Sequence, residues 1–174
     1  GYHENYGHRG DLRAMAVQLI PHLVSRIVYS GAGGFNPWAL GMEYVLSPRA
    51  TFLSCVASRE TGGRRPIYHD IDERLAGEGW KRTHLICGDR LISPRAGWQR
   101  LATTSLVVTL IEAGLRPGDD VELADPVAAL RTFNADLSCV AEVKAKRGKP
   151  LTALGIQRHL LAMTPGSYTG KAAA

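Results

Sequence analysis

Short strand-like runs in the middle of the chain, with helical periodicity on both sides, limit the folds that this sequence can adopt. The strand-like runs cover residues 43–46, 51–57 and 83–87, and residues 140–145 read as an edge strand. Helical periodicity covers residues 11–30, 101–113, 127–133 and 152–163. Because the strands cluster instead of alternating one by one with helices, the pattern predicts an α+β fold with a mostly antiparallel sheet.

The first helical stretch has one apolar stripe. Its apolar residues recur in steps of three or four, at Leu12, Met15, Leu19, Leu23 and Ile27. Pro21 lies within this stretch and is expected to kink it, since a proline inside a helix removes one hydrogen bond. The Gly-rich segment from Gly31 should end the helix, and Asp125 followed by Pro126 should begin a later one.

Composition narrows the class of protein. The 174 residues suit one domain, and 45% apolar with 21% charged residues is typical of a globular protein. The net charge of +5 suits anionic partners such as nucleotide, phosphate or nucleic acid. Three cysteines without CxxC spacing indicate core thiols and a cytoplasmic location, and the uncharged stretch at residues 14–25 is too short to span a membrane.

Two histidines are candidate functional groups. His3 precedes Glu4 and Asn5, but the next histidine, His8, is one residue too far along to complete a zinc-protease motif. His84 interrupts an otherwise apolar strand, so it is either a hydrogen-bonded core histidine or a metal ligand. Spacing alone leaves both readings open.

Several arginines stand next to predicted strands. Arg49, Arg65 and Arg82 could converge on a phosphate, which arginine grips with two parallel hydrogen bonds, or they could be solvated loop residues. The acidic cluster Asp70, Asp72 and Glu73 could hold a hard cation or offset these arginines. No nucleophile pair and no stripe of aromatics among basic residues can be defended from spacing.

Seven segments, taken together and in order, resemble the Pup ligase and Pup deamidase/depupylase family. They are Tyr2-His3-Glu4-Asn5-Tyr6, Pro21-His22-Leu23-Val24-Ser25-Arg26, Gly31-Ala32-Gly33, Leu46-Ser47-Pro48-Arg49, Arg65-Pro66-Ile67 with Asp72-Glu73, Arg82-Thr83-His84-Leu85-Ile86-Cys87-Gly88-Asp89, and Leu154-Gly155-Ile156-Gln157-Arg158. Corresponding family segments include Gly-x-His-Glu-Asn-Tyr, Leu-Ser-Gln-Arg, Arg-Pro-Ile-Ile-Asn-Thr-Arg-Asp-Glu and Arg-Leu-His-Val-Ile-x-Gly-Asp. The likeness covers about residues 1–161.

The resemblance implies a glutamine-synthetase-like fold, in which a curved, mostly antiparallel sheet flanked by helices binds ATP and Mg²⁺. A carboxylate is activated by phosphorylation, and an isopeptide or amide bond is formed or cleaved. The implied partners are a Pup-like protein or another carboxylate substrate, and components of the proteasome pathway; nucleic acid and membranes are not implied. Residues 1–163 would be the central part of the catalytic domain, and residues 164–174 a flexible tail.

The resemblance also assigns roles to residues, although it identifies no catalytic residue. His3 and His84 are expected to be metal ligands, and Arg49, Arg65 and Arg82 to contact ATP phosphates. The supporting residues would be Glu4, Asn5, Asp72 and Glu73.

Departures from the family pattern keep alternatives open. Ile71 replaces an arginine, and the Glu-x-Glu ligands and catalytic aspartate of the family have no counterpart. The chain, which begins Gly-Tyr-His-Glu-Asn, is therefore expected to be a fragment of such an enzyme. The alternatives are a non-catalytic relative that binds Pup or nucleotide, and a basic nucleic-acid-binding domain.

Overall fold

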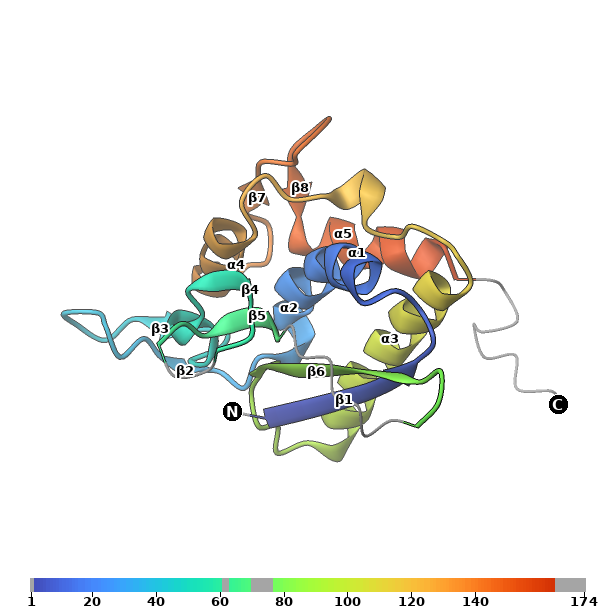
Figure 1. Cartoon of the computed structure of the whole chain (residues 1–174). Coiled ribbons are helices and arrows are strands. Elements are labelled where there is room, and N and C mark those ends of the chain that lie inside the picture. The colour runs from blue at the N-terminus through green and yellow to red at the C-terminus, as the bar shows by residue number, and fades with distance from the viewer. Residues whose placement is uncertain (1, 61–62, 70–76, 165–174) are drawn as a thin grey trace, which may run out of the picture.

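A four-stranded mixed sheet forms one side of the protein. The computed structural model describes residues 2–60, 63–69 and 77–164. The strand order is β1 (Tyr2–His8), β6 (Lys81–Gly88), β5 (Pro66–His69) and β4 (Cys55–Ser58). Only β4 and β5 are parallel; the other two neighbouring pairs are antiparallel. Figure 1 shows β1 and β6 side by side, with α1 above them in that view.

Helices pack against one face of this sheet and against one another. They are α1 (Leu12–Ser25), α2 (Ile27–Ser30), α3 (Pro94–Glu112), α4 (Pro126–Ala135) and α5 (Ala153–Ala162). Helix α1 contacts α3, α4 and α5 as well as β5 and β6, and α3 contacts β1. The core includes Met15, Leu19, Leu85, Val107 and Ile156. The predicted α+β class with a mostly antiparallel sheet is confirmed.

Two small hairpins complete the described chain. They are β2 (Gly34–Phe35) with β3 (Tyr44–Val45), and β7 (Glu142–Val143) with β8 (Leu151–Thr152). The predicted edge strand at residues 140–145 is thus reduced to β7. Among the described residues, no helix has the length and apolar character that a membrane crossing requires.

Pro21 does not break the helix in which it was expected to cause a kink. Helix α1 continues through Pro21 and ends at Ser25, and Arg26 separates it from α2. The residues around Pro21 are buried, so packing outweighs the single hydrogen bond that proline removes. The Ser25 hydroxyl donates to the Pro21 carbonyl at 2.6 Å.

The predicted strand at residues 51–57 is wrong in its first half. A 3₁₀ helix, η1, covers Ala50–Phe52, and the strand begins only at Cys55. Ser47 Oγ accepts from the Ala50 amide at 3.1 Å, and Thr51 Oγ1 donates to the Pro48 carbonyl at 2.7 Å. These local bonds favour a turn over an extended strand.

The predictions for the two last helices are close to the structure, whereas the start of α3 was predicted too late. Helix α4 begins after Asp125, whose carboxylate accepts from the amides of Val127 and Ala128. Helix α5 begins after the Thr152 cap. Helix α3 begins at Pro94, earlier than predicted, after the Ser93 cap.

The Gly31–Gly34 turn after α2 is needed for close packing. A Cβ on Gly31 would lie 2.2 Å from the Leu46 carbonyl oxygen, and one on Gly33 would lie 2.2 Å from the Tyr44 hydroxyl. Gly33 also has a φ of +70°, which glycine adopts without strain. The turn at the end of α2 therefore packs closely against the segment that contains Tyr44 and Leu46, which leads to Arg49.

Candidate functional site

Strand β1 has two chemically different faces. Glu4, Tyr6 and His8 are buried, whereas His3 and Asn5 are exposed. This alternation follows from the period of two in a β-strand. On β6, His84 pairs with Asn5, so His3, Asn5 and His84 belong to the face away from the helices. We call this surface the open face.

His3 and His84, the two expected metal ligands, lie next to each other. His3 Nδ1 lies 3.0 Å from His84 Nε2, across the pair of strands β1 and β6. On its other side, His84 Nδ1 lies 3.3 Å from Nδ1 of His69, the last residue of β5. We call these three residues the imidazole cluster. Burial lowers the pKa of His84, and the charges of His69, His3 and Arg82 lower it further.

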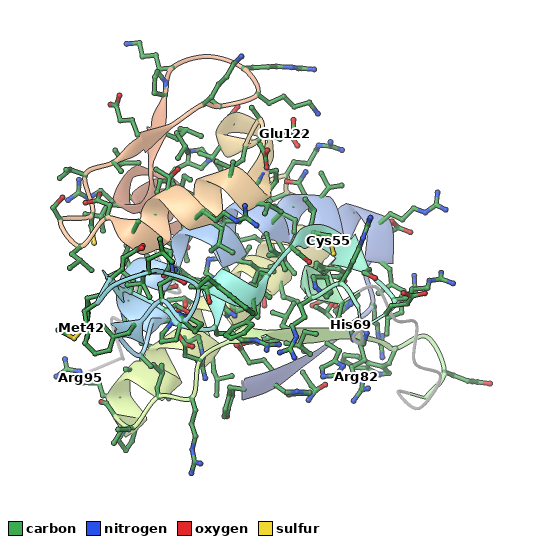
Figure 2. The ribbon with its side chains drawn as sticks, turned by 90° about the vertical axis from the view of Figure 1, so that its left-hand side faces the viewer. Met42, Cys55, His69, Arg82, Arg95 and Glu122 are labelled. Carbon is green, nitrogen blue, oxygen red and sulfur yellow. The ribbon has the colours of Figure 1, made fainter. Side chains whose placement is uncertain are left out.

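Sequence reasoning missed His69. His69 comes directly before the acidic cluster Asp70, Asp72 and Glu73, which was considered as a cation site. Its pairing with His84 joins strand β5 to strand β6. The alternation of His84 within its strand was visible, but nothing local identified the strand on its far side. Figure 2 shows His69 and Arg82 at the same end of the molecule, away from Met42 and Arg95.

Two of the three candidate arginines flank His84 along β6. Arg82 lies two residues before His84 in the same strand, opposite Gly7. Arg49 Nε and Nη2 donate to the Ile86 carbonyl at 3.1 and 3.0 Å, two residues beyond His84. Burial lowers the pKa of Arg49, and the neighbouring charge of Arg65 lowers it further.

Arg65 and Arg49 are held differently. The exposed guanidinium of Arg65 lies over the Phe52 ring, 5.6 Å from its centroid. The loop of Arg49 is tied to the end of β6, because Asp89 accepts from the Arg49 amide at 3.2 Å and from the Ala32 amide at 3.1 Å. Arg49 is therefore part of the fold as well as a candidate phosphate contact.

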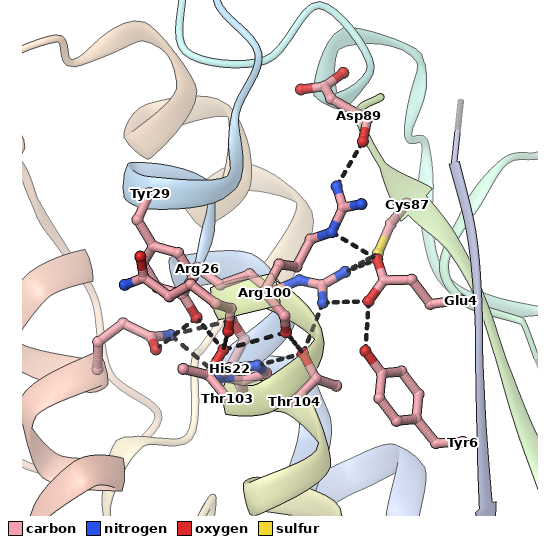
Figure 3. Close-up of polar contacts among 12 residues, drawn as sticks. Glu4, Tyr6, His22, Arg26, Tyr29, Cys87, Asp89, Arg100, Thr103 and Thr104 are labelled. Carbon is pink, nitrogen blue, oxygen red and sulfur yellow. Dashed lines mark hydrogen bonds and ion pairs between the residues drawn. The ribbon is translucent and has the colours of Figure 1, made fainter. Parts of the chain in front are cut away.

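Glu4, expected to support the site, lies on the buried face. Only 1% of Glu4 is exposed. Its two carboxylate oxygens each accept from Arg26 at 2.8 Å, and Tyr6 donates to it at 2.7 Å. Arg100 Nε lies 3.5 Å away. Figure 3 shows the carboxylate between these groups, so any support it gives acts through the position of β1.

The pKa shifts in this buried network follow from burial and charge. Burial raises the pKa of Glu4, but Arg26 offsets this with its charge and hydrogen bonds, and the net pKa is lowered. Burial and the nearby Glu4 charge raise the pKa of Tyr6. Burial and the Arg26 charge hold the pKa of His22 well below its usual value.

The network extends from β1 into three helices. Arg26 donates to Thr104 Oγ1 at 2.8 Å, and that hydroxyl lies 2.9 Å from His22 Nε2. Gln157 of α5 donates to Ser25 Oγ at 2.7 Å. Glu4 is thus fixed by elements that are far apart in the sequence.

The described residues form no complete metal cage. Asp72 and Glu73 lie outside the described residues, so their predicted supporting role has no structural test. Within residues 2–60, 63–69 and 77–164, no group of three or more His, Cys, Asp or Glu side chains is arranged to hold a metal ion. The imidazole cluster fits this finding, because His84 turns opposite nitrogens toward His3 and His69.

The chain is similar in sequence to curated Pup–protein ligases. It is 37% identical over 160 residues to the Pup–protein ligase of Geodermatophilus obscurus, covering 90% of this chain and 35% of the relative. It is 37% identical over 164 residues to that of Pseudarthrobacter chlorophenolicus, covering 92% and 36%. The chain thus spans about a third of the length of these curated relatives.

Solved structures agree in fold. The Pup ligase PafA in complex with ADP superposes with a TM-score of 0.76 at 29% identity, over 93% of this chain and 36% of the ligase. The complex between Pup and PafA gives a TM-score of 0.75 at 29% identity, over 92% and 33%. The model of the family described as Pup-ligase protein matches residues 1–172. The chain therefore belongs to the Pup-ligase protein family.

Proposed function

We propose that this chain is part of an ATP- and Mg²⁺-dependent ligase that activates a carboxylate by phosphorylation and joins it to an amine, with a Pup-like protein as substrate. The observation that carries the proposal is the open face, on which His3 and His84 lie in contact and arginines stand on either side along β6. The similar PafA structures include one with ADP and one with Pup. The relatives are named as ligases, which favours ligation over the hydrolysis that the resemblance also allowed.

The charge of this face suits a nucleotide. In phosphoryl transfer, negative charge spreads over the phosphate oxygens, and fixed cations stabilise it. Arg82 and Arg49 stand on either side of His84 along β6, and Arg49 is anchored to the Ile86 carbonyl. Arg65, whose guanidinium lies over the Phe52 ring, offers a third cation. We assign the three arginines to phosphate contacts. Asn5, opposite His84, lies where it can hydrogen-bond a ligand on this face.

The imidazole pair fits a divalent cation only in part. His3 and His84 would be two ligands, and a cation bound there would neutralise charge on nearby phosphate oxygens. Mg²⁺ prefers oxygen ligands in an octahedral arrangement, whereas imidazole nitrogen suits transition-metal ions such as Zn²⁺. The described residues supply no carboxylate to this pair, so the chemistry proposed for them ends at binding.

The remaining assignments follow from the same proposal. Residues 1–163 would be the central part of the catalytic domain, and residues 164–174 a tail. The enzyme would act in the cytoplasm, with proteasome-pathway components as further partners. The alternatives are a non-catalytic relative and a nucleic-acid-binding domain. A full-length protein that does not join Pup to an acceptor in the experiment below would favour one of these alternatives.

The test measures ATP binding and the ATP-dependent joining of Pup to a lysine-containing acceptor by the full-length protein. Arg65→Ala and Arg82→Ala should each weaken ATP binding, whereas Arg13→Ala, which removes an exposed arginine of α1, is the matched control. ADP formation that depends on Pup and the acceptor identifies ligation. Unchanged ATP affinity in both variants would favour the alternative, in which Arg65 and Arg82 are solvated and contact no phosphate.

A further inference from the structure

His84 is the middle ring of a continuous hydrogen-bonded chain. Its Nε2 faces His3 Nδ1 at 3.0 Å, and its Nδ1 faces His69 Nδ1 at 3.3 Å. The ring centroids of the two pairs are 5.1 and 5.2 Å apart. At the far end, His69 Nε2 lies 3.2 Å from the backbone carbonyl oxygen of Arg59, just after β4. Three strands of the sheet therefore contribute to one line of polar contacts.

When the rings are neutral, the carbonyl at one end sets the direction of the hydrogen bonds. A carbonyl oxygen only accepts, so His69 Nε2 carries a proton and donates to Arg59. In a neutral His69 ring, Nδ1 then holds a lone pair and accepts from His84 Nδ1–H. His84 Nε2 in turn holds a lone pair, which accepts from His3 Nδ1–H. Three neutral rings satisfy all three contacts.

We propose that His69 is a positioning residue, which accepts a hydrogen bond from His84 Nδ1 and so keeps the lone pair of His84 Nε2 directed at His3. The proposal deepens the proposed function, because the same Nε2 lone pair is the one that would bind a divalent cation beside His3. Histidines that bind metals commonly donate their second nitrogen to a neighbouring acceptor, which fixes their tautomer and orientation.

His69 is well placed for this role. Only 4% of it is exposed, and its Cα is in register with that of His84 in the antiparallel pair β5–β6. The bond to Arg59 O anchors its outer nitrogen, so its inner lone pair has a fixed direction. Burial, the largest cause of the lowered pKa of His84, agrees with a neutral ring.

A carboxamide oxygen can also accept the hydrogen bond from His84, whereas a phenyl ring of similar shape to imidazole cannot. His69→Asn and His69→Phe therefore form a matched pair. The first keeps an acceptor and the second removes it.

The first measurement is the tautomer of His84 in the full-length protein at pH 8, read from long-range ¹H–¹⁵N NMR spectra of ¹⁵N-histidine-labelled protein. Loss of signals in His84→Gln assigns the ring. We expect the proton on Nδ1 in the unmodified protein and in His69→Asn, and a mixture of tautomers in His69→Phe. A proton on Nε2 of the unmodified protein would overturn the proposal.

The second measurement is the affinity for Mn²⁺, used alone as the probe. Loss of a residue that orients a metal-bound histidine typically weakens binding by about 10–100-fold, which we expect for His69→Phe, with recovery in His69→Asn. Equal affinity in His69→Phe and the unmodified protein would also overturn the positioning role. If the unmodified protein does not bind Mn²⁺, the cation site proposed above fails, and the tautomer measurement by itself decides the role of His69.

Discussion

The polar groups on the two faces of strand β1 differ in burial and in the number of their protein partners. On the buried face, Glu4 is held by Arg26, Tyr6 and Arg100, with every group enclosed. On the open face, the exposed His3 contacts a partly buried His84. Adjacent residues of one strand thus serve different ends, because burial decides whether a polar group is committed to the fold or remains accessible to a ligand.

The energetic reason is the cost of desolvation. A buried charge is tolerated only when its partners replace the water that it loses, and Glu4 has a bidentate arginine and a tyrosine hydroxyl for this purpose. An exposed imidazole keeps access to water and loses little when its partner leaves. The comparison therefore predicts that substitutions on the buried face greatly lower the stability of the protein, whereas substitutions on the open face weaken ligand binding.

The largest effect is expected from breaking the buried side of the comparison. Glu4→Gln keeps the size of the side chain but leaves Arg26 and Arg100 without their carboxylate. Removing one partner of a buried ion pair costs about 3–5 kcal/mol of unfolding free energy. Urea denaturation of the full-length protein measures this loss, with Asn5→Ala on the open face as the control. A loss as small as that of the control would show that the network is solvated.

The next effect tests the open face through nucleotide binding. Arg65→Ala should weaken ATP binding by about 1.5–3 kcal/mol, or roughly 10–150-fold, if its guanidinium bonds a phosphate. Because Arg65 is exposed, unfolding should change little. Arg49→Ala should weaken ATP binding and also destabilise the protein, since its guanidinium bonds the Ile86 carbonyl. Isothermal titration calorimetry and urea denaturation separate the two losses, and equal stability of both variants would contradict the distinction.

Local signals in the sequence predicted much of the fold. The Asp125 and Thr152 caps begin α4 and α5 as capping chemistry requires, and the apolar stripe of α1 faces the core. The start of α3 was missed although Ser93-Pro94 is a good start signal, because the residues that follow are polar and show no apolar period. Capping residues thus predict the start of a helix where an apolar helical period follows them directly.

The site was less accessible to sequence reasoning because its contacts are long-range. The resemblance to a family assigned His3 and His84 to one metal site. Their spacing in the sequence had left the role of each histidine open. The contacts of Glu4 with Arg26 and of His69 with His84 span 22 and 15 residues of sequence. Both depend on strand pairing and helix docking, for which these residues give no local signal.

A pH titration should expose a second buried group. Folding lowers the pKa of His22 well below 6.5, so the unfolded chain binds the proton more readily. The stabilisation is therefore complete above about pH 6.5 and is lost as the pH falls toward the folded-state pKa of His22, at up to about 1.4 kcal/mol per pH unit. Urea denaturation of the nucleotide-free protein between pH 8 and 5 measures the slope, and His22→Gln should reduce it. An unchanged slope in that variant would assign the pH dependence to other histidines, such as His8 and His84.

The smallest effect on stability should come from the open side of the comparison. His3 is exposed, and its contact with His84 Nε2 can be replaced by water when the ring is removed. His3→Ala should therefore change the unfolding free energy by no more than about 0.5 kcal/mol, as exposed substitutions usually do. The same variant should bind Mn²⁺ more weakly than the unmodified protein, because one of two proposed imidazole ligands is gone. A loss of stability comparable to that of Glu4→Gln would mean that both faces of β1 stabilise the fold. That result would contradict the proposal that the open face is a binding surface.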